Sequence, residues 1–209
     1  MNWEIKEQPD KEILEELHSK LNIPKFICTL LLQRNIDSLK LAQSYFRPNL
    51  DDLHDPFLMK DMDKTVDRLT RAIESSEKIM ILGDYDVDGT TSVSMLYDYF
   101  KKKTLDPIYY IPDRYKEGYG VSDESIDFAE ENNVSLLITI DCGIKANDKI
   151  ESANTKGIDV IICDHHIPDN SIPKAYSIIN PNQNKCDYPF KGLCGCGIGF
   201  KLISAIEKK

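Results

Sequence analysis

The feature that most constrains the fold is a series of short apolar runs that alternate with segments of helical spacing. The main runs cover 79–82, 136–140 and 160–163, and shorter runs lie at 108–111 and 178–179. Strands without a polar face are typical of parallel sheets that helices cover on both sides. We therefore expect an α/β fold with an open, mainly parallel sheet, helices on both faces and right-handed crossovers.

The segments between these runs have the spacing of amphipathic helices. The expected helices cover 62–75, 90–102, 122–132, 145–155 and 198–207. The earlier part of the chain has shorter helical patterns, the first of them formed by Ile13, Leu14, Leu17 and Leu21. We expect two parts, a small helical N-terminal extension over 1–60 and the α/β domain over 61–209.

Acidic residues exceed basic residues by 35 to 26, which gives a net charge of −9. Proteins that bind nucleic acids on their own usually carry a basic face, so a polyanionic substrate would need local basic groups, bound cations or another domain. No apolar run approaches the ~20 residues that cross a bilayer, and the N-terminus does not read as a signal peptide. The 6 cysteines lack the spacing of a disulfide framework, which favours reduced thiols in a cytoplasmic protein.

Acidic and imidazole side chains follow three of the expected strands. In chain order they are Asp84, Asp86 and Asp88, then Asp141, and then Asp164, His165 and His166. Ligands of open parallel sheets bind outside the carboxyl ends of the strands. We therefore expect these side chains to converge at one edge of the sheet, although they lie far apart in the sequence.

Five carboxylates gathered at one edge would repel one another strongly. A pair of divalent cations would relieve that repulsion, and carboxylates with imidazole suit Mn²⁺ or Mg²⁺, the histidine favouring Mn²⁺. Two such ions about 3.5–4 Å apart would polarise a phosphate and activate water. Zinc is disfavoured, because no cysteine pair lies beside the acids with ligand spacing.

The acidic run after the first strand permits another interpretation, a calcium-binding loop. Such a loop starting at Asp84 needs a bidentate glutamate at its twelfth position, which is Met95 here and cannot coordinate calcium. Gly89 instead permits a tight turn, and Thr90 or Thr91 is expected to cap the helix that follows.

These residues resemble the first three motifs of the DHH phosphoesterase superfamily, and further segments resemble its RecJ-like branch of single-strand exonucleases. The segments that carry the likeness are 83–89, Asp141 and 164–166, together with 32–36, 55–57, 111–114, 117–120 and 193–202. The resemblance implies a metal-dependent phosphodiesterase that digests single-stranded DNA from 5′ to 3′ in repair and recombination.

The resemblance also implies a role for each matching residue. Direct metal ligands would be Asp86, Asp88, Asp141 and His165, with Asp141 bridging two ions. Asp84 would be a further ligand or accept a hydrogen bond from one. Asp164 would orient an imidazole and His166 would face the scissile phosphate, so both are expected to be catalytic. Arg114 is a candidate phosphate contact, and its alternative is a surface salt bridge.

Members of this family have further parts that this sequence does not contain. They are a fourth motif with another metal-binding aspartate, a second domain with a glycine-rich substrate motif and, in RecJ-like proteins, an oligonucleotide-binding fold. We therefore expect a truncated chain that folds as the DHH domain, with weakened metal affinity and little or no nuclease activity. Contacts to single-stranded DNA would come mainly from the missing domains.

Two other functions stay open. The first is a related phosphoesterase for short oligonucleotides, cyclic dinucleotides or pyrophosphate, but the segments around Arg34 and Asp55 favour the exonuclease, because smaller relatives lack that extension. The second is a non-catalytic DHH scaffold in replication. Degenerate scaffolds lose their ligands, whereas the expected ligand set is complete here as far as Asp164, His165 and His166.

Overall fold

A computed structural model describes residues 3–103 and 106–209 of the chain. They form two compact units, Met1–Leu53 and His54–Lys209. The second unit begins a few residues before the expected boundary at 60, because His54 packs with it. The buried ammonium of Lys201 donates a hydrogen bond to the carbonyl oxygen of His54 at 2.6 Å.

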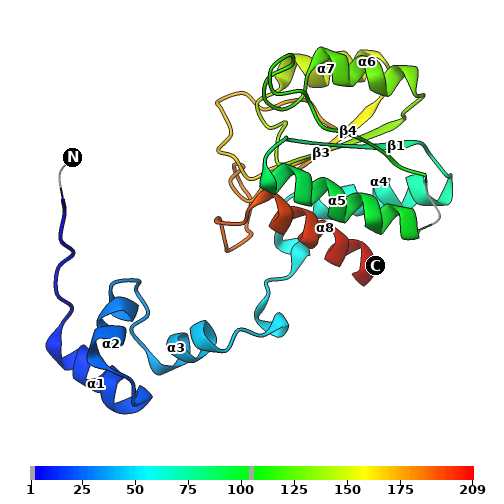
Figure 1. Cartoon of the computed structure of the whole chain (residues 1–209). Coiled ribbons are helices and arrows are strands. Elements are labelled where there is room, and N and C mark those ends of the chain that lie inside the picture. Colours follow the sequence, from blue (N-terminus) through cyan, green and yellow to red (C-terminus); the bar gives the residue numbers. More distant parts are fainter. Residues whose placement is uncertain (1–2, 104–105) are drawn as a thin grey trace. The chain divides into compact units, whose positions relative to one another are not determined.

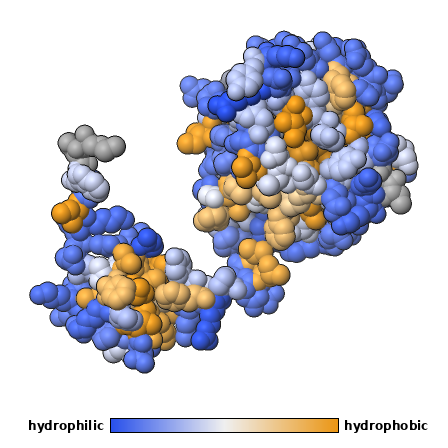
Figure 2. Space-filling model, viewed as in Figure 1, coloured by the Kyte–Doolittle hydropathy of each residue, from blue (hydrophilic) through white to orange (hydrophobic). Residues whose placement is uncertain are grey.

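The first unit is helical, as expected. It contains α1 (Lys11–Leu21), α2 (Lys25–Leu32), α3 (Leu39–Phe46) and a 3₁₀ turn, η1 (Leu50–Asp52). Its small core consists of Leu17, Cys28, Leu31 and Ala42. Apolar side chains also gather on the visible side of this unit in Figure 2, and Phe26 is 65% exposed.

The second unit is built around five parallel strands in the order β2-β1-β3-β4-β5, which confirms the expected α/β class. The strands are β1 (Ile79–Gly83), β2 (Ile108–Tyr110), β3 (Leu136–Ile140), β4 (Asp159–Cys163) and β5 (Ser177–Ile179). Every residue of β1 and β3 is buried, in agreement with their apolar sequences.

Helices cover both faces of this sheet (Figure 1). One face carries α4 (Met62–Glu74), α5 (Val87–Lys102) and α8 (Gly195–Lys208), and the other carries α6 (Asp123–Glu131) and α7 (Asn147–Thr155); a 3₁₀ turn, η2 (Pro56–Leu58), precedes α4. Two apolar cores result, one on each side of the sheet. None of the helices in the described part of the chain is long and apolar enough to cross a bilayer.

The strand order places a topological switch point between β1 and β3, where successive connections lead to opposite sides of the sheet. From β1 the chain moves outward to β2 and then returns to the other side of β1 to form β3. Open parallel sheets bind ligands at such a point, outside the carboxyl ends of the two strands. The acidic segments after β1 and β3 lie at this position.

Candidate metal centre

The register of the sheet brings three aspartates to the same level. Gly83 pairs with Ile140, and Ile140 pairs with Cys163, so that β1, β3 and β4 end side by side. The residue that follows each strand is an aspartate: Asp84 after β1, Asp141 after β3 and Asp164 after β4. Each is at most 2% exposed. The expected convergence at one edge of the sheet is therefore present.

The turn after β1 is tight because Gly89 packs directly on Asp84. A Cβ atom on Gly89 would lie 2.3 Å from the carbonyl oxygen of Asp84, which leaves room only for glycine. The helix α5 begins at Val87, three residues before the expected start at 90. Its N-cap is Asp86, whose carboxylate accepts a hydrogen bond from the Gly89 N–H at 3.0 Å.

One expectation about this turn is wrong. Thr90 and Thr91 do not cap α5, because their hydroxyls donate back to carbonyl oxygens of the preceding turn. The calcium loop, which the sequence already disfavoured, does not fit the structure, because α5 begins at Val87, long before the twelfth position of such a loop.

Asp84 is buried beneath this turn. Burial and the neighbouring charge of Asp86 raise the pKa of its carboxyl, although backbone N–H groups act in the opposite direction. In the described part of the chain, Asp84 Oδ1 and Gln183 Oε1 are the buried side-chain polar atoms without a hydrogen-bond partner. A buried carboxylate oxygen without a partner is costly unless something else satisfies it.

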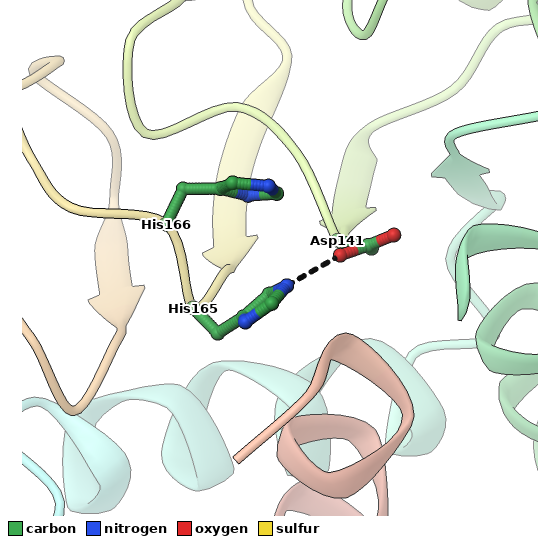
Figure 3. A group of neighbouring side chains, drawn as sticks. All are labelled: Asp141, His165 and His166. Atoms are coloured by element: carbon green, nitrogen blue, oxygen red, sulfur yellow. Dashed lines mark hydrogen bonds and ion pairs between the residues drawn. The ribbon is translucent and has the colours of Figure 1, made fainter. Parts of the chain in front are cut away.

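Asp141 is the centre of the cluster. Its backbone has a φ of 62°, a left-handed conformation that a non-glycine residue adopts at a cost. His165 Nε2 lies 3.0 Å from Asp141 Oδ1 (Figure 3). One ligand atom each from Asp141, His165 and His166 lies within 4.8 Å of the others. Burial and the charges of Asp88 and Asp86 raise the pKa of Asp141 to about 7.

Asp88 approaches the cluster from the first turn of α5. Its Oδ2 lies 3.6 Å from His165 Nε2. The same carboxylate accepts two backbone hydrogen bonds from the first turn of α8, from Gly195 N–H at 2.6 Å and from Cys196 N–H at 2.8 Å. Gly195 also packs on Asp141, because a Cβ atom there would lie 2.6 Å from Asp141 Cβ. The start of α8 therefore fixes two of the expected ligands.

Asp164 holds the second histidine. His166 Nδ1 lies 2.7 Å from Asp164 Oδ1, and the backbone N–H of Ile144 donates to Asp164 Oδ2 at 3.0 Å. Burial alone would raise the pKa of Asp164, but these hydrogen bonds outweigh it and lower that pKa. The bond to Asp164 raises the pKa of His166. This pair thus resembles a carboxylate that orients an imidazole.

Arg114 lies outside the cluster. Its side chain is exposed, and its guanidinium carbon lies 5.2 Å from the ring centroid of Tyr85. In the sequence, Tyr85 lies between Asp84 and Asp86. Among the described residues, no carboxylate oxygen lies within 4.0 Å of its nitrogens, so the surface salt bridge is absent here.

Several residues that position the site escaped the sequence analysis. Asn180 and Asn182 follow β5, and their amide groups donate to the carbonyl oxygens of His166 at 2.9 Å and His165 at 2.6 Å. Tyr119 donates from its hydroxyl to the carbonyl oxygen of Asp141 at 2.9 Å. The sequence held a signal for the two asparagines, because they follow the end of β5 in the same way as the aspartates follow the other strands.

The donor set fits divalent cations. Carboxylate oxygens and imidazole nitrogens are suitable ligands for Mn²⁺ and Mg²⁺. A cation beside Asp141 would favour the ionised carboxylate, whose pKa is otherwise raised to about 7. The buried Oδ1 of Asp84 is a further carboxylate oxygen without a hydrogen-bond partner at this edge of the sheet. Two cysteines adjoin these aspartates in sequence, Cys142 and Cys163, and burial raises the pKa of both thiols, which disfavours a thiolate ligand.

Known proteins share this architecture. The chain is 41% identical to the single-stranded-DNA-specific exonuclease RecJ of Bacillus subtilis (strain 168), over 99% of this chain and 26% of that protein. A crystal structure of exonuclease RecJ bound to manganese matches with a TM-score of 0.66 and 30% identity, over 72% of this chain and 38% of that one. RecJ from Thermus thermophilus in complex with Mn²⁺ shares the fold, with a TM-score of 0.77 and 23% identity, over 96% of this chain and 28% of that one.

This chain therefore spans about a quarter of the length of its Bacillus relative, 26%. The likeness to RecJ-like proteins that the motifs predicted is confirmed in sequence and in structure. A family model described as the DHH family, N-terminal domain, matches residues 78–209, which include every acidic and imidazole residue of the cluster. The chain belongs to the DHH family.

Proposed function

We propose that this chain is the metal-binding, phosphate-cleaving domain of a 5′→3′ exonuclease specific for single-stranded DNA. The observation that carries the proposal is the convergence of buried Asp84, Asp141 and Asp164 with His165 and His166 at the carboxyl edge of the sheet. Support comes from the relatives, which are named as single-stranded-DNA-specific exonucleases. A cytoplasmic role in DNA repair and recombination is the finer part of the same proposal.

The residues of the cluster divide into holding and supporting groups. Asp86, Asp88, Asp141 and His165 would hold two ions of Mn²⁺ or Mg²⁺, and Asp84 would be a further ligand or accept a hydrogen bond from one. When bound, such ions polarise a phosphate and lower the pKa of water. The chain fixes the donors in advance, because the Asp88 carboxylate already has both oxygens hydrogen-bonded.

His166 would donate a proton, and Asp164 would orient its imidazole ring. Asp164 occupies Nδ1 of the His166 ring at 2.7 Å, which fixes the ring, and Nε2 lies 3.4 Å from the Tyr119 hydroxyl. The raised pKa of His166 favours its protonated form. A protonated imidazole in this position can stabilise the charge of the scissile phosphate and donate a proton to the leaving oxygen.

Arg114 would bind a phosphate of the substrate. The exposed guanidinium stands over Tyr85 and has no carboxylate partner among the described residues, so it is available to an anion. A planar guanidinium can donate two parallel hydrogen bonds to a phosphate, which lysine cannot. This contact would supply local positive charge on a chain whose net charge is −9.

The alternative of an enzyme for short substrates has less support. The likeness to the Bacillus exonuclease covers 99% of this chain and so includes the first helical unit. The alternative of a non-catalytic scaffold has less support, because Asp88, Asp141 and Asp164 lie in contact with His165 or His166.

Calorimetric titration with Mn²⁺ tests the proposal. The wild-type chain is expected to bind Mn²⁺, and Asp141→Asn to lose most of that affinity. Asp98→Asn, an exposed aspartate on the same helix as Asp88 and paired with Lys102, serves as the matched control and should bind like the wild type. A 5′-labelled single-strand digestion then measures cleavage. Equal Mn²⁺ binding by wild type and Asp141→Asn would refute the assignment of the site.

A further inference from the structure

Two cysteines lie on either side of Gly195, the first residue of α8. Cys194 is the N-cap of this helix and is exposed, and Cys196 is half-buried in its first turn. All cysteines of the chain are free thiols, but Cys28, Cys142 and Cys163 are buried. The proposed metal chemistry uses neither Cys194 nor Cys196, so another role for this pair is open.

The sulfur of Cys194 is placed to act as a nucleophile. It accepts a hydrogen bond from the backbone N–H of Gly197 at 3.4 Å, in the way that a serine caps a helix. A backbone N–H and the positive end of a helix stabilise negative charge, which an attacking sulfur must carry. The exposed Cys194 would therefore react first with a solute, and Cys196 would react second.

The spacing of the two cysteines permits a disulfide. One residue separates them, so their Cα atoms lie at most about 7 Å apart even in an extended chain, and closer in a helical turn. Disulfides span about 4.4–6.8 Å between Cα atoms. The residue between them, Gly195, has no side chain to obstruct a change in the backbone.

The same short segment holds two of the expected metal ligands. The N–H groups of Gly195 and Cys196 donate to the Asp88 carboxylate at 2.6 and 2.8 Å, and Gly195 packs on Asp141. A disulfide between the cysteines would close a small ring that contains both of these peptide units. Because the bridge has its own preferred dihedral angle, the two N–H groups must turn away from their present direction.

We propose that Cys194 and Cys196 form a reversible disulfide on reaction with a peroxide, and that this disulfide weakens metal binding. The Cys194 sulfur attacks one oxygen of hydrogen peroxide, the O–O bond breaks, and a sulfenic acid and water form. The Cys196 sulfur then attacks the sulfenic sulfur, the S–S bond forms, the S–O bond breaks, and a second water leaves. Each thiol loses one hydrogen, and the peroxide is reduced to water.

A dithiol reverses the reaction by thiol–disulfide exchange. Disulfides of this transient kind are the ones that occur in reducing compartments, where they sense oxidants. The effect on metal affinity rests on the proposed function, whereas the disulfide and the disturbance of α8 do not.

Peptide mass spectrometry tests the bridge. The chain is treated with hydrogen peroxide, and its remaining thiols are alkylated before digestion with trypsin. The expected peptide, residues 192–201, contains Cys194 and Cys196 and no other cysteine. After peroxide it should lack two hydrogens and carry no alkyl group, and dithiothreitol should restore both sites of alkylation.

Calorimetry with Mn²⁺ and amide hydrogen exchange then measure the consequence, after the peroxide has been removed. The oxidised wild type is expected to bind Mn²⁺ about 10–100-fold more weakly, the usual effect of disturbing groups behind metal ligands. The amides of Gly195 and Cys196 should exchange faster. Cys194→Ser, whose hydroxyl can still cap α8, should keep its affinity and its exchange rates after peroxide. Cys186→Ser, at another half-buried cysteine, is the matched control and should respond as the wild type does.

Three results overturn the inference. They are two alkylated thiols in the peptide after peroxide, a disulfide that leaves the Mn²⁺ affinity of a metal-binding chain unchanged, and a loss of affinity that persists in Cys194→Ser. If the reduced wild type binds no Mn²⁺, the proposed function fails. The disulfide and the faster exchange at the start of α8 then decide the inference by themselves.

Discussion

Asp88 Oδ2 accepts a hydrogen bond from the backbone N–H of Gly195 at 2.6 Å, across 107 residues of sequence. Asp88 lies in the first turn of α5 and Gly195 is the first residue of α8, and these two helices pack against each other on the same face of the sheet. Gly195 also packs directly against the side chain of Asp141, where a larger residue would not fit. The metal centre therefore depends on a residue that has no ligand atom of its own.

Gly195→Ala is expected to lower the affinity for Mn²⁺. A Cβ atom would lie 2.6 Å from Asp141 Cβ and 2.8 Å from Asp141 Oδ1, so the aspartate must shift. Substitutions that disturb the groups behind metal ligands typically reduce affinity about 10–100-fold. Calorimetry with Mn²⁺ measures the change. Gly197→Ala in the same helix is the control, since its Cβ would meet side-chain atoms of Leu193, the nearest at 3.2 Å, and Cys194 Sγ at 3.8 Å, and no expected metal ligand is among them. Unchanged binding by Gly195→Ala would contradict this account.

Asn180→Ala is expected to destabilise the fold and to weaken Mn²⁺ binding. The amide of Asn180 is fully buried and donates to the carbonyl oxygen of His166, while its Oδ1 accepts from the N–H of Asn182. Leaving these groups without partners costs about 1–3 kcal/mol in the free energy of unfolding. Urea denaturation measures this loss, and calorimetry measures the metal affinity. Asn184→Ala, at an exposed position of the same loop, should change neither.

Glu77→Gln is expected to reduce stability at neutral pH but less at acid pH. Arg68 donates two hydrogen bonds to Glu77, at 3.0 and 2.7 Å, and these bonds lower the pKa of that carboxyl. Because the pKa is lower in the folded state, the stabilisation is present above the unfolded pKa of about 4.3 and is lost as pH falls through the folded pKa.

The measurement is urea denaturation at pH 7 and at several values below about pH 4.5, near the unfolded pKa of a glutamate. At pH 7 the free energy of unfolding of the wild type should exceed that of Glu77→Gln by about 1–3 kcal/mol, as expected for hydrogen bonds to a charged group. The difference should shrink toward acid pH. Glu131→Gln, at the exposed end of α6, is the control and should follow the wild type throughout. A difference independent of pH would show that the charge of Glu77 is not responsible.

Mn²⁺ is expected to raise the thermal midpoint of the wild-type chain. An ion that binds only the folded state stabilises it by about 2.7 kcal/mol at 100 times its Kd. Excess chelator should reverse the shift, and Asp141→Asn should abolish it. Differential scanning calorimetry at several ion concentrations supplies the test. If Asp141→Asn is stabilised as strongly as the wild type, the ion binds elsewhere.

The sequence predicted the sheet well because its strands are apolar on both faces. Runs such as those in β1 and β3 leave few alternatives once helices lie between them. The acidic groups could be placed at one edge for the same reason, since the carboxyl ends of parallel strands coincide. Chemistry alone then indicated divalent cations.

The starts of two helices could not be predicted. The expected starts at 90 and 198 were late, because Gly89 and Gly195 weaken helical patterns. Each glycine is needed for close packing on an aspartate, Asp84 or Asp141. The supporting contacts were also out of reach. Nothing in the local sequence indicates that Gly195 meets Asp88, or that Tyr119 meets the backbone of Asp141.

The place of α8 in the chain has a consequence for protein synthesis. The last imidazole, His166, leaves the ribosome before the residues that secure Asp88 and Asp141, which begin at Gly195. A nascent chain that has all these donors still lacks the backbone groups that hold two of them. If the chain binds metal ions as proposed, tight binding would require that α8 has docked against α5.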